Sequence, residues 1–143
     1  MADQELSLRG INIQEKWAKL IYSGEKIVEA HTYKPGCYAG ENWLIETPTK
    51  PKGQRKRAEI TGTIRFGDAV EYSSYDEWRA DFKRHRVEPG SAFDWMSCKG
   101  KMFGWPILEA RRLAEPIPVP SIRGMKGCKE YRARVVFESQ CEN

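Results

Sequence analysis

The sequence predicts an α+β fold, in which a mixed β-barrel of about six short strands carries two or more short helices. Three observations support this prediction: short alternating segments outnumber helical ones, no β-α-β order occurs, and no internal repeat is present. The 143 residues suit one domain, 1–143, with a core at about 6–138. We expect flexible tails at 1–5 and 139–143 and a basic loop at 48–57.

Four segments in the first third of the chain have a readable pattern. Residues 6–13 alternate apolar with polar or small residues, the period of a half-buried strand. Apolar residues then recur at helical spacing, which predicts a short helix that ends at Gly24. The pattern predicts further strands at 26–32 and 42–47.

The second half begins with the most regular segment of the chain. Residues 59–66 alternate strictly and predict a strand that crosses the core. Ser74 starts an S-x-x-E capping box, so we expect a helix that runs to about His85. Residues 102–114 are helical by propensity but extended by their flanking prolines, and 131–138 predict a last strand.

Composition excludes several classes of protein. With 40% apolar and 31% charged residues, the chain can bury a core, and its apolar runs are too short to span a membrane. No signal peptide is apparent, so we expect a cytoplasmic protein. Four cysteines lie far apart without a C-x-x-C motif, which predicts reduced thiols, no metal site and no cofactor; they are Cys37, Cys98, Cys128 and Cys141.

The net charge of +4 is concentrated in one segment. Five cations occur within the eight residues 50–57, where proline and glycine disfavour regular structure. These side chains suit contacts with nucleic-acid phosphates, although a solvated loop without a partner has the same composition; they are Lys50, Lys52, Arg55, Lys56 and Arg57. Arg123 and Lys126 accompany a Gly-x-x-Gly segment that suits a phosphate or simply a turn.

Two stretches of the chain resemble the ASCH domain, a branch of the PUA-like superfamily. The first stretch, residues 11–47, carries a tryptophan-bearing helix followed by Gly-x-Lys-x-x-Glu, matched here by Trp17, Gly24, Lys26 and Glu29. The second stretch, residues 104–127, carries Gly-Trp, Leu-Glu, Pro-Ile-Pro and a glycine-rich run. His31 stands where family members usually carry arginine.

The resemblance implies a module that binds nucleic acid, with RNA expected ahead of DNA as the ligand. It implies no membrane partner. A nucleotide or strand would enter a basic cleft of a PUA-like barrel, in which Lys26 contacts a phosphate or base carbonyl. Glu29 would accept a hydrogen bond from a base amino group or hold a neighbouring cation. His31 and Tyr33 would lie at the same cleft, and residues 102–114 would form a strand. Without the resemblance, the favoured interpretation is an exposed Lys26 and an ion-paired Glu29, and the resemblance makes the two interpretations even.

Two other classes of function remain open. Some ASCH relatives resemble amidohydrolases of N4-acetylcytidine, for which Lys26 matches but Glu29 replaces the expected threonine. A metal-independent ribonuclease would use Lys26 with Tyr33 or Tyr38 and Ser121. If the protein is an enzyme, Lys26 and Glu29 are its catalytic residues. A protein-interaction adaptor would show neither binding nor turnover of nucleic acid.

His31 gives the first testable expectation. An ordinary histidine titrates near pH 6.5, so a contact between His31 and a phosphate should strengthen as the pH falls. Affinity for nucleic acid should therefore drop between about pH 6 and pH 8 more steeply than in His31→Arg, measured by fluorescence anisotropy. Parallel pH curves for the two proteins would contradict this role.

Overall fold

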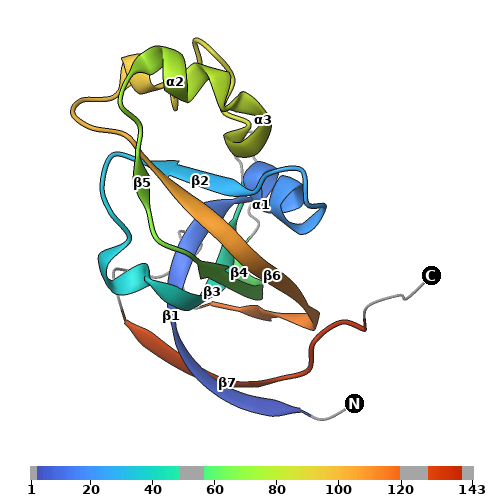
Figure 1. Cartoon of the computed structure of the whole chain (residues 1–143). Coiled ribbons are helices and arrows are strands. Elements are labelled where there is room, and N and C mark those ends of the chain that lie inside the picture. The colour runs from blue at the N-terminus through green and yellow to red at the C-terminus, as the bar shows by residue number, and fades with distance from the viewer. Residues whose placement is uncertain (1–2, 49–56, 120–128, 140–143) are drawn as a thin grey trace.

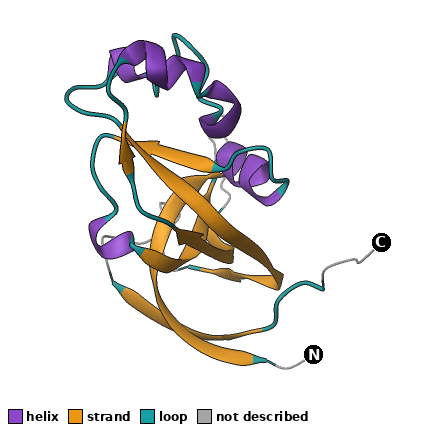
Figure 2. Ribbon diagram, viewed as in Figure 1, coloured by secondary structure: helices purple, strands orange, loops and turns teal. Residues whose placement is uncertain are grey.

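The computed structural model describes residues 3–48, 57–119 and 129–139, and Figures 1 and 2 show its arrangement. The strands within these residues are β1 (Gln4–Gln14), β2 (Val28–His31), β3 (Gly40–Thr47), β4 (Glu59–Phe66), β5 (Val70–Glu71), β6 (Phe103–Pro118) and β7 (Glu130–Val135). The helices are α1 (Glu15–Tyr22), α2 (Tyr75–Ala80) and α3 (Phe82–His85), with single 3-10 turns at Gly36–Tyr38 and Trp95–Ser97.

The strands form one mixed sheet in the order β2-β6-β4-β3-β1-β7, with β5 paired to β6. Among the strand pairs of the described residues, β1–β3 alone is parallel. In Figure 1, β6 runs diagonally across the molecule, with α2 and α3 at one end and β7 at the other.

The α+β class is confirmed, but the expected closed barrel is not formed by the described residues. After β7 ends, the chain returns to β6 through a single bridge between Leu113 and Phe137. Two backbone hydrogen bonds flank this bridge, from Ala114 to Val136 and from Glu138 to Arg112. One bridge is too short to make a continuous ladder, so the sheet remains open between its end strands β2 and β7.

Local sequence patterns explain most of these elements. Strand β4 has the predicted bounds, and its alternate residues Ile60, Gly62, Ile64 and Phe66 are all buried. Helix α1 ends as predicted, because Gly24 adopts φ +84° and its N–H bonds to the carbonyl of Ile21. Strand β2 is shorter than predicted.

The ambiguous segment 102–114 is extended. Strand β6 pairs with β4 along most of its length and with β2 and β5 near its start. These ladders satisfy its backbone groups, which outweighs the helical propensity of residues 109–113.

The predicted helix after Ser74 is present but broken. The Ser74 side chain accepts a hydrogen bond from the N–H of Glu77 at 3.1 Å, as the capping box requires. At Asp81 the backbone leaves helical geometry, and the chain resumes as the single turn α3 before Arg86 ends it at φ 63°. We refer to residues 74–98, which hold both helices and the following loop, as the helical unit.

Gly62 tests how tightly the centre of the sheet is packed. A Cβ at this position would collide with the backbone carbonyl of Arg111 and with the hydroxyl of Tyr22. Since a backbone atom in a paired strand cannot move aside, Gly62→Ala should lower the free energy of unfolding by about 1–3 kcal/mol in urea titrations. The matched control is Gly67→Ala, whose new methyl meets only the exposed side chain of Leu108. Equal losses in the two variants would contradict this reading of the sheet.

Candidate functional site

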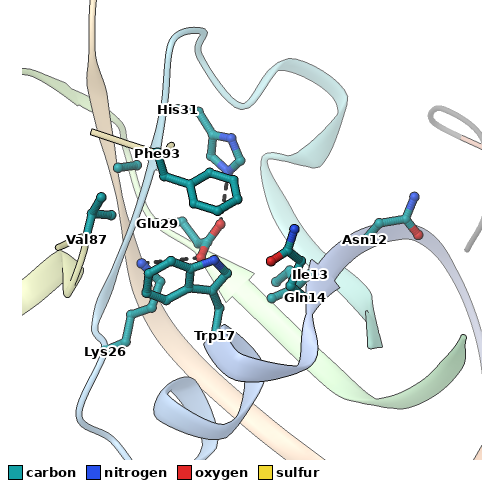
Figure 3. Close-up of a pocket in the computed structure, with 10 residues that line it drawn as sticks. Asn12, Ile13, Gln14, Trp17, Lys26, Glu29, His31, Val87 and Phe93 are labelled. Atoms are coloured by element: carbon teal, nitrogen blue, oxygen red, sulfur yellow. Dashed lines mark hydrogen bonds and ion pairs between the residues drawn. The ribbon is translucent and has the colours of Figure 1, made fainter. Parts of the chain in front are cut away.

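A pocket of about 230 Å³ opens where the sheet, α1 and the helical unit meet (Figure 3). The end of β1 contributes Gln14, and α1 contributes Trp17. Strand β2 contributes Glu29 and His31, and the helical unit contributes Phe93. Segments far apart in the sequence thus build one small cavity that has both apolar and charged walls.

Lys26 lies at the floor of this pocket and is only 2% exposed. Its ammonium Nζ donates a hydrogen bond to the carbonyl of His85 at 2.5 Å and lies 3.5 Å from Oε1 of Glu29. It also lies 4.9 Å from the centroid of the Trp17 ring. This buried cation therefore contacts a carbonyl, a carboxylate and an aromatic ring.

The backbone explains how residues 26 and 29 can meet. On a regular strand, positions three apart point to opposite faces of the sheet. Lys26, however, precedes β2, and its N–H bonds to the carbonyl of Leu20 at the end of α1. Lys26 therefore lies in the turn before β2, and the interpretation of Lys26 as an exposed lysine is wrong.

Glu29 is 7% exposed and shares its carboxylate between two neighbours. Oε1 faces Lys26, and Oε2 accepts a hydrogen bond from Nε2 of His31 at 3.0 Å. Burial raises the pKa of Glu29, but the Lys26 charge and the His31 hydrogen bond outweigh it, so the pKa is lowered and the group is a carboxylate. Burial lowers the pKa of Lys26, and the neighbouring Glu29 carboxylate offsets only part of this effect.

His31 is held by an aromatic cluster. Its ring lies 4.0 Å from the ring of Trp105 and 5.1 Å from that of Tyr33, measured between centroids. The Trp105 indole in turn donates to the backbone carbonyl of Tyr33 at 2.9 Å. Trp105 is fully buried, and its ring packs against the imidazole of His31.

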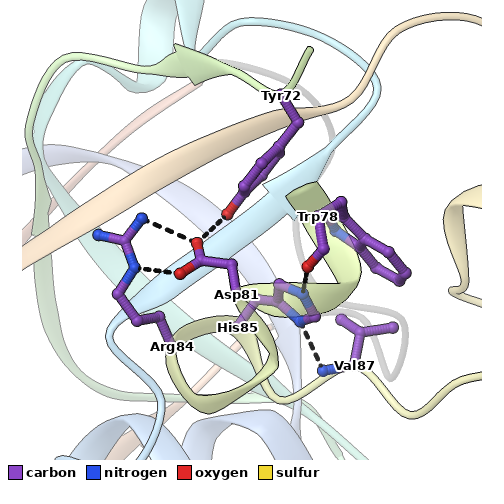
Figure 4. Close-up of polar contacts among 6 residues, drawn as sticks. All are labelled: Tyr72, Trp78, Asp81, Arg84, His85 and Val87. Carbon is purple, nitrogen blue, oxygen red and sulfur yellow. Dashed lines mark hydrogen bonds and ion pairs between the residues drawn. The ribbon is translucent and has the colours of Figure 1, made fainter. Parts of the chain in front are cut away.

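His85, which sequence reasoning missed, connects the helical unit to the pocket (Figure 4). Its Nδ1 accepts a hydrogen bond from the N–H of Val87 at 2.9 Å, so Nε2 carries the proton and donates to the carbonyl of Trp78 at 2.7 Å. Burial lowers the pKa of His85, and the nearby Lys26 charge adds to this effect. The imidazole is therefore neutral and fixes the turn whose carbonyl holds Lys26.

Two aspartates brace the helical unit. Asp81 accepts from the hydroxyl of Tyr72 at 2.5 Å and from two guanidinium nitrogens of Arg84 (Figure 4). Asp94 is buried and accepts from the backbone N–H groups of Gly90 and Met96, both at 2.8 Å, and from the hydroxyl of Tyr75. The bonds to Asp94 fix the loop that carries Phe93 at the pocket wall.

Of the predicted site residues, the structure brings together Lys26, Glu29 and His31. Tyr33 is exposed beside His31 but does not line the pocket. Arg57 lines a separate cavity of about 240 Å³ with Glu46 and Glu59. The other predicted cations lie outside the described residues; they are Lys50, Lys52, Arg55, Lys56, Arg123 and Lys126.

One expectation about cysteines is wrong. Cys37 is disulfide-bonded, whereas Cys98 is free. This bond removes the argument from reduced thiols for a cytoplasmic location. Within 3–48, 57–119 and 129–139, no helix is long and apolar enough to span a membrane, and no cluster of three metal-ligating side chains occurs.

The ion pair predicts a defined pH dependence of stability. Because the pKa of Glu29 in the fold is lowered from its ordinary 4.5, its stabilising contribution is present above about pH 4.5 and is lost as the pH falls through the folded-state value. Glu29→Gln leaves Lys26 buried without a counter-charge, so it should lower the free energy of unfolding by roughly 3–5 kcal/mol near neutral pH. The difference in the free energy of unfolding between the unaltered protein and Glu29→Gln should become smaller at acidic pH, because Glu29 is then protonated.

The matched control is Glu25→Gln, because Glu25 is exposed and precedes the same buried lysine. Urea titrations of the three proteins across the acidic range provide the measurement. A loss in Glu29→Gln that is independent of pH, or matched by Glu25→Gln, would contradict the ion pair's role.

Comparisons with known proteins identify similar solved structures but no protein that is similar in sequence. No family model matches the chain, and no curated protein matches it. Among solved structures, an ASCH protein from Zymomonas mobilis shares 18% identity at a TM-score of 0.55, over 77% of this chain and 72% of that one. A serine-to-alanine mutant of that protein shares 19% identity at a TM-score of 0.56, over 76% of this chain and 72% of that one. The resemblance to the ASCH domain is thus confirmed as a likeness of fold: this chain has the ASCH fold.

Proposed function

We propose that the chain is a PUA-like RNA-binding module that holds one base or nucleoside in the pocket beside Lys26, Glu29 and His31. The observation that carries this proposal is the Glu29 carboxylate, paired with Lys26 and His31, in the wall of a small cavity that Trp17 and Phe93 also line. A carboxylate fixes the polar edge of a base, and aromatic rings stack on its faces.

The size of the pocket supports a single base. Cavities that enclose drug-sized ligands are roughly 300–1,000 Å³, whereas this one has about 230 Å³. Three of its walls are aromatic: Trp17, Phe93 and the imidazole of His31. Phe93 is 41% exposed, so its ring is available for stacking.

The basic segments would supply the contacts that position the strand. We assign phosphate contacts to the cations of 50–57 and to Arg123 and Lys126, because such contacts add affinity without reading sequence. Tyr33 would stack on a neighbouring base outside the pocket, since it is exposed beside His31.

Binding is better supported than hydrolysis. The N4-acetylcytidine amidohydrolase alternative needs a side-chain hydroxyl within reach of its activating group. Among the described residues that line the pocket, none carries a hydroxyl, and the Lys26 ammonium already bonds to the His85 carbonyl and pairs with Glu29. That alternative therefore needs a side chain from elsewhere.

Phe93 tests the proposal with little risk to the fold. Loss of one stacking ring costs about 1–3 kcal/mol per base, so Phe93→Ala should weaken binding of single-stranded RNA roughly 5- to 150-fold, measured by fluorescence anisotropy. The control is Met96→Ala, which alters the same loop at a 74% exposed side chain that does not line the pocket.

Duplex RNA and duplex DNA serve as competing ligands in the same titration, and recovered strands are checked for cleavage. Intact RNA and a selective loss in Phe93→Ala are the expected results. Absence of RNA binding, equal affinities in the two variants, or shortened strands would contradict the proposal.

A further inference from the structure

We infer that the pocket selects guanine, because Glu29 requires a base that presents two adjacent N–H donors. This inference rests on the proposed function and names its ligand. Guanine carries N1–H beside the N2 amino group, and together they match the two oxygens of a carboxylate. The other standard bases lack this pair.

The geometry around Glu29 limits what can approach it. Its Oε1 pairs with the Lys26 ammonium, and its Oε2 accepts a hydrogen bond from His31, so the carboxylate is held in one orientation. Each oxygen can accept more than one hydrogen bond. Glu29 lines the cavity with Trp17 and Phe93, so a base held in the cavity would lie next to its carboxylate (Figure 3).

An ionised carboxylate accepts hydrogen bonds but donates none, and this excludes the other bases as good partners. Uracil offers one ring N–H between two carbonyl oxygens. Cytosine and adenine each place an amino group beside a ring nitrogen that is an acceptor. In all three, a lone pair would face the negative carboxylate, which costs binding energy in a partly buried site.

The groups beside Glu29 complete the match to guanine. The O6 carbonyl of guanine follows N1 on the same edge, so it would face donors next to the carboxylate. The Lys26 ammonium lies 3.5 Å from Oε1 of Glu29, and Gln14 lines the same pocket, so both would be near O6. Trp17 and Phe93 provide the aromatic surfaces that any base needs.

The test varies one base in a fixed strand. Oligouridylates that carry a single central guanine, inosine, adenine, cytosine or uracil are titrated against the unaltered protein by fluorescence anisotropy. Inosine keeps N1–H and O6 but lacks the 2-amino group. We expect guanine to bind tightest and inosine to lose about tenfold, the discrimination typical of one incomplete bidentate contact.

Glu29→Gln adds a second arm, with Glu25→Gln as its control. The amide should remove the preference for guanine over inosine, whereas Glu25→Gln keeps it. Thermal unfolding confirms that each variant is folded, and the inosine comparison needs no variant at all.

The outcomes separate the inference from the proposed function. If the protein binds every strand with equal affinity, the preference for guanine is wrong and RNA binding stands. If Glu29→Gln weakens all strands by the same factor, Glu29 has a structural role and the inference is also wrong. If no strand binds, the proposed function fails, and the inference fails with it.

Discussion

The buried ion pair between Lys26 and Glu29 is the constraint on which the rest of this structure depends. Removal of two charges from water is costly, and mutual attraction offsets that cost only when other polar groups complete their shells. Here the carbonyl of His85 completes the shell of Lys26, and His31 completes that of Glu29. The backbone N–H of Ile27 also bonds to the carbonyl of Arg84, which joins the start of β2 to the helical unit beside the pair.

The proposed function rests on this arrangement rather than on the fold. The ASCH fold is a scaffold, and likeness at 18–19% identity says nothing about the ligand. The ion pair holds a carboxylate in the wall of the cavity, and α1 and the helical unit add Trp17 and Phe93. Asp94 fixes the loop that carries Phe93. These residues are positioned before any ligand arrives, which limits the ordering cost of binding.

Local patterns predicted much of the fold. Strict alternation gave β4 its correct bounds, and the capping box located the start of α2. Lys26, Glu29 and His31 were predicted because they lie within six residues of one another in a family-like motif. His85 and Asp94 carry no such signal, since their partners are backbone groups that only the tertiary structure brings into reach. The extended state of β6, the open sheet and the Cys37 disulfide likewise depend on contacts between distant segments.

The most direct measurement uses the tryptophan indoles as reporters of where RNA binds. Trp17 lines the pocket, whereas Trp43 is fully buried in another cluster, with its indole donating to the carbonyl of Tyr131 at 2.7 Å. In nitrogen–proton correlation spectra of the labelled protein titrated with single-stranded RNA, the Trp17 indole signal should move and the Trp43 signal should stay. RNA that binds while the Trp17 signal remains fixed would place the binding site elsewhere and contradict the account.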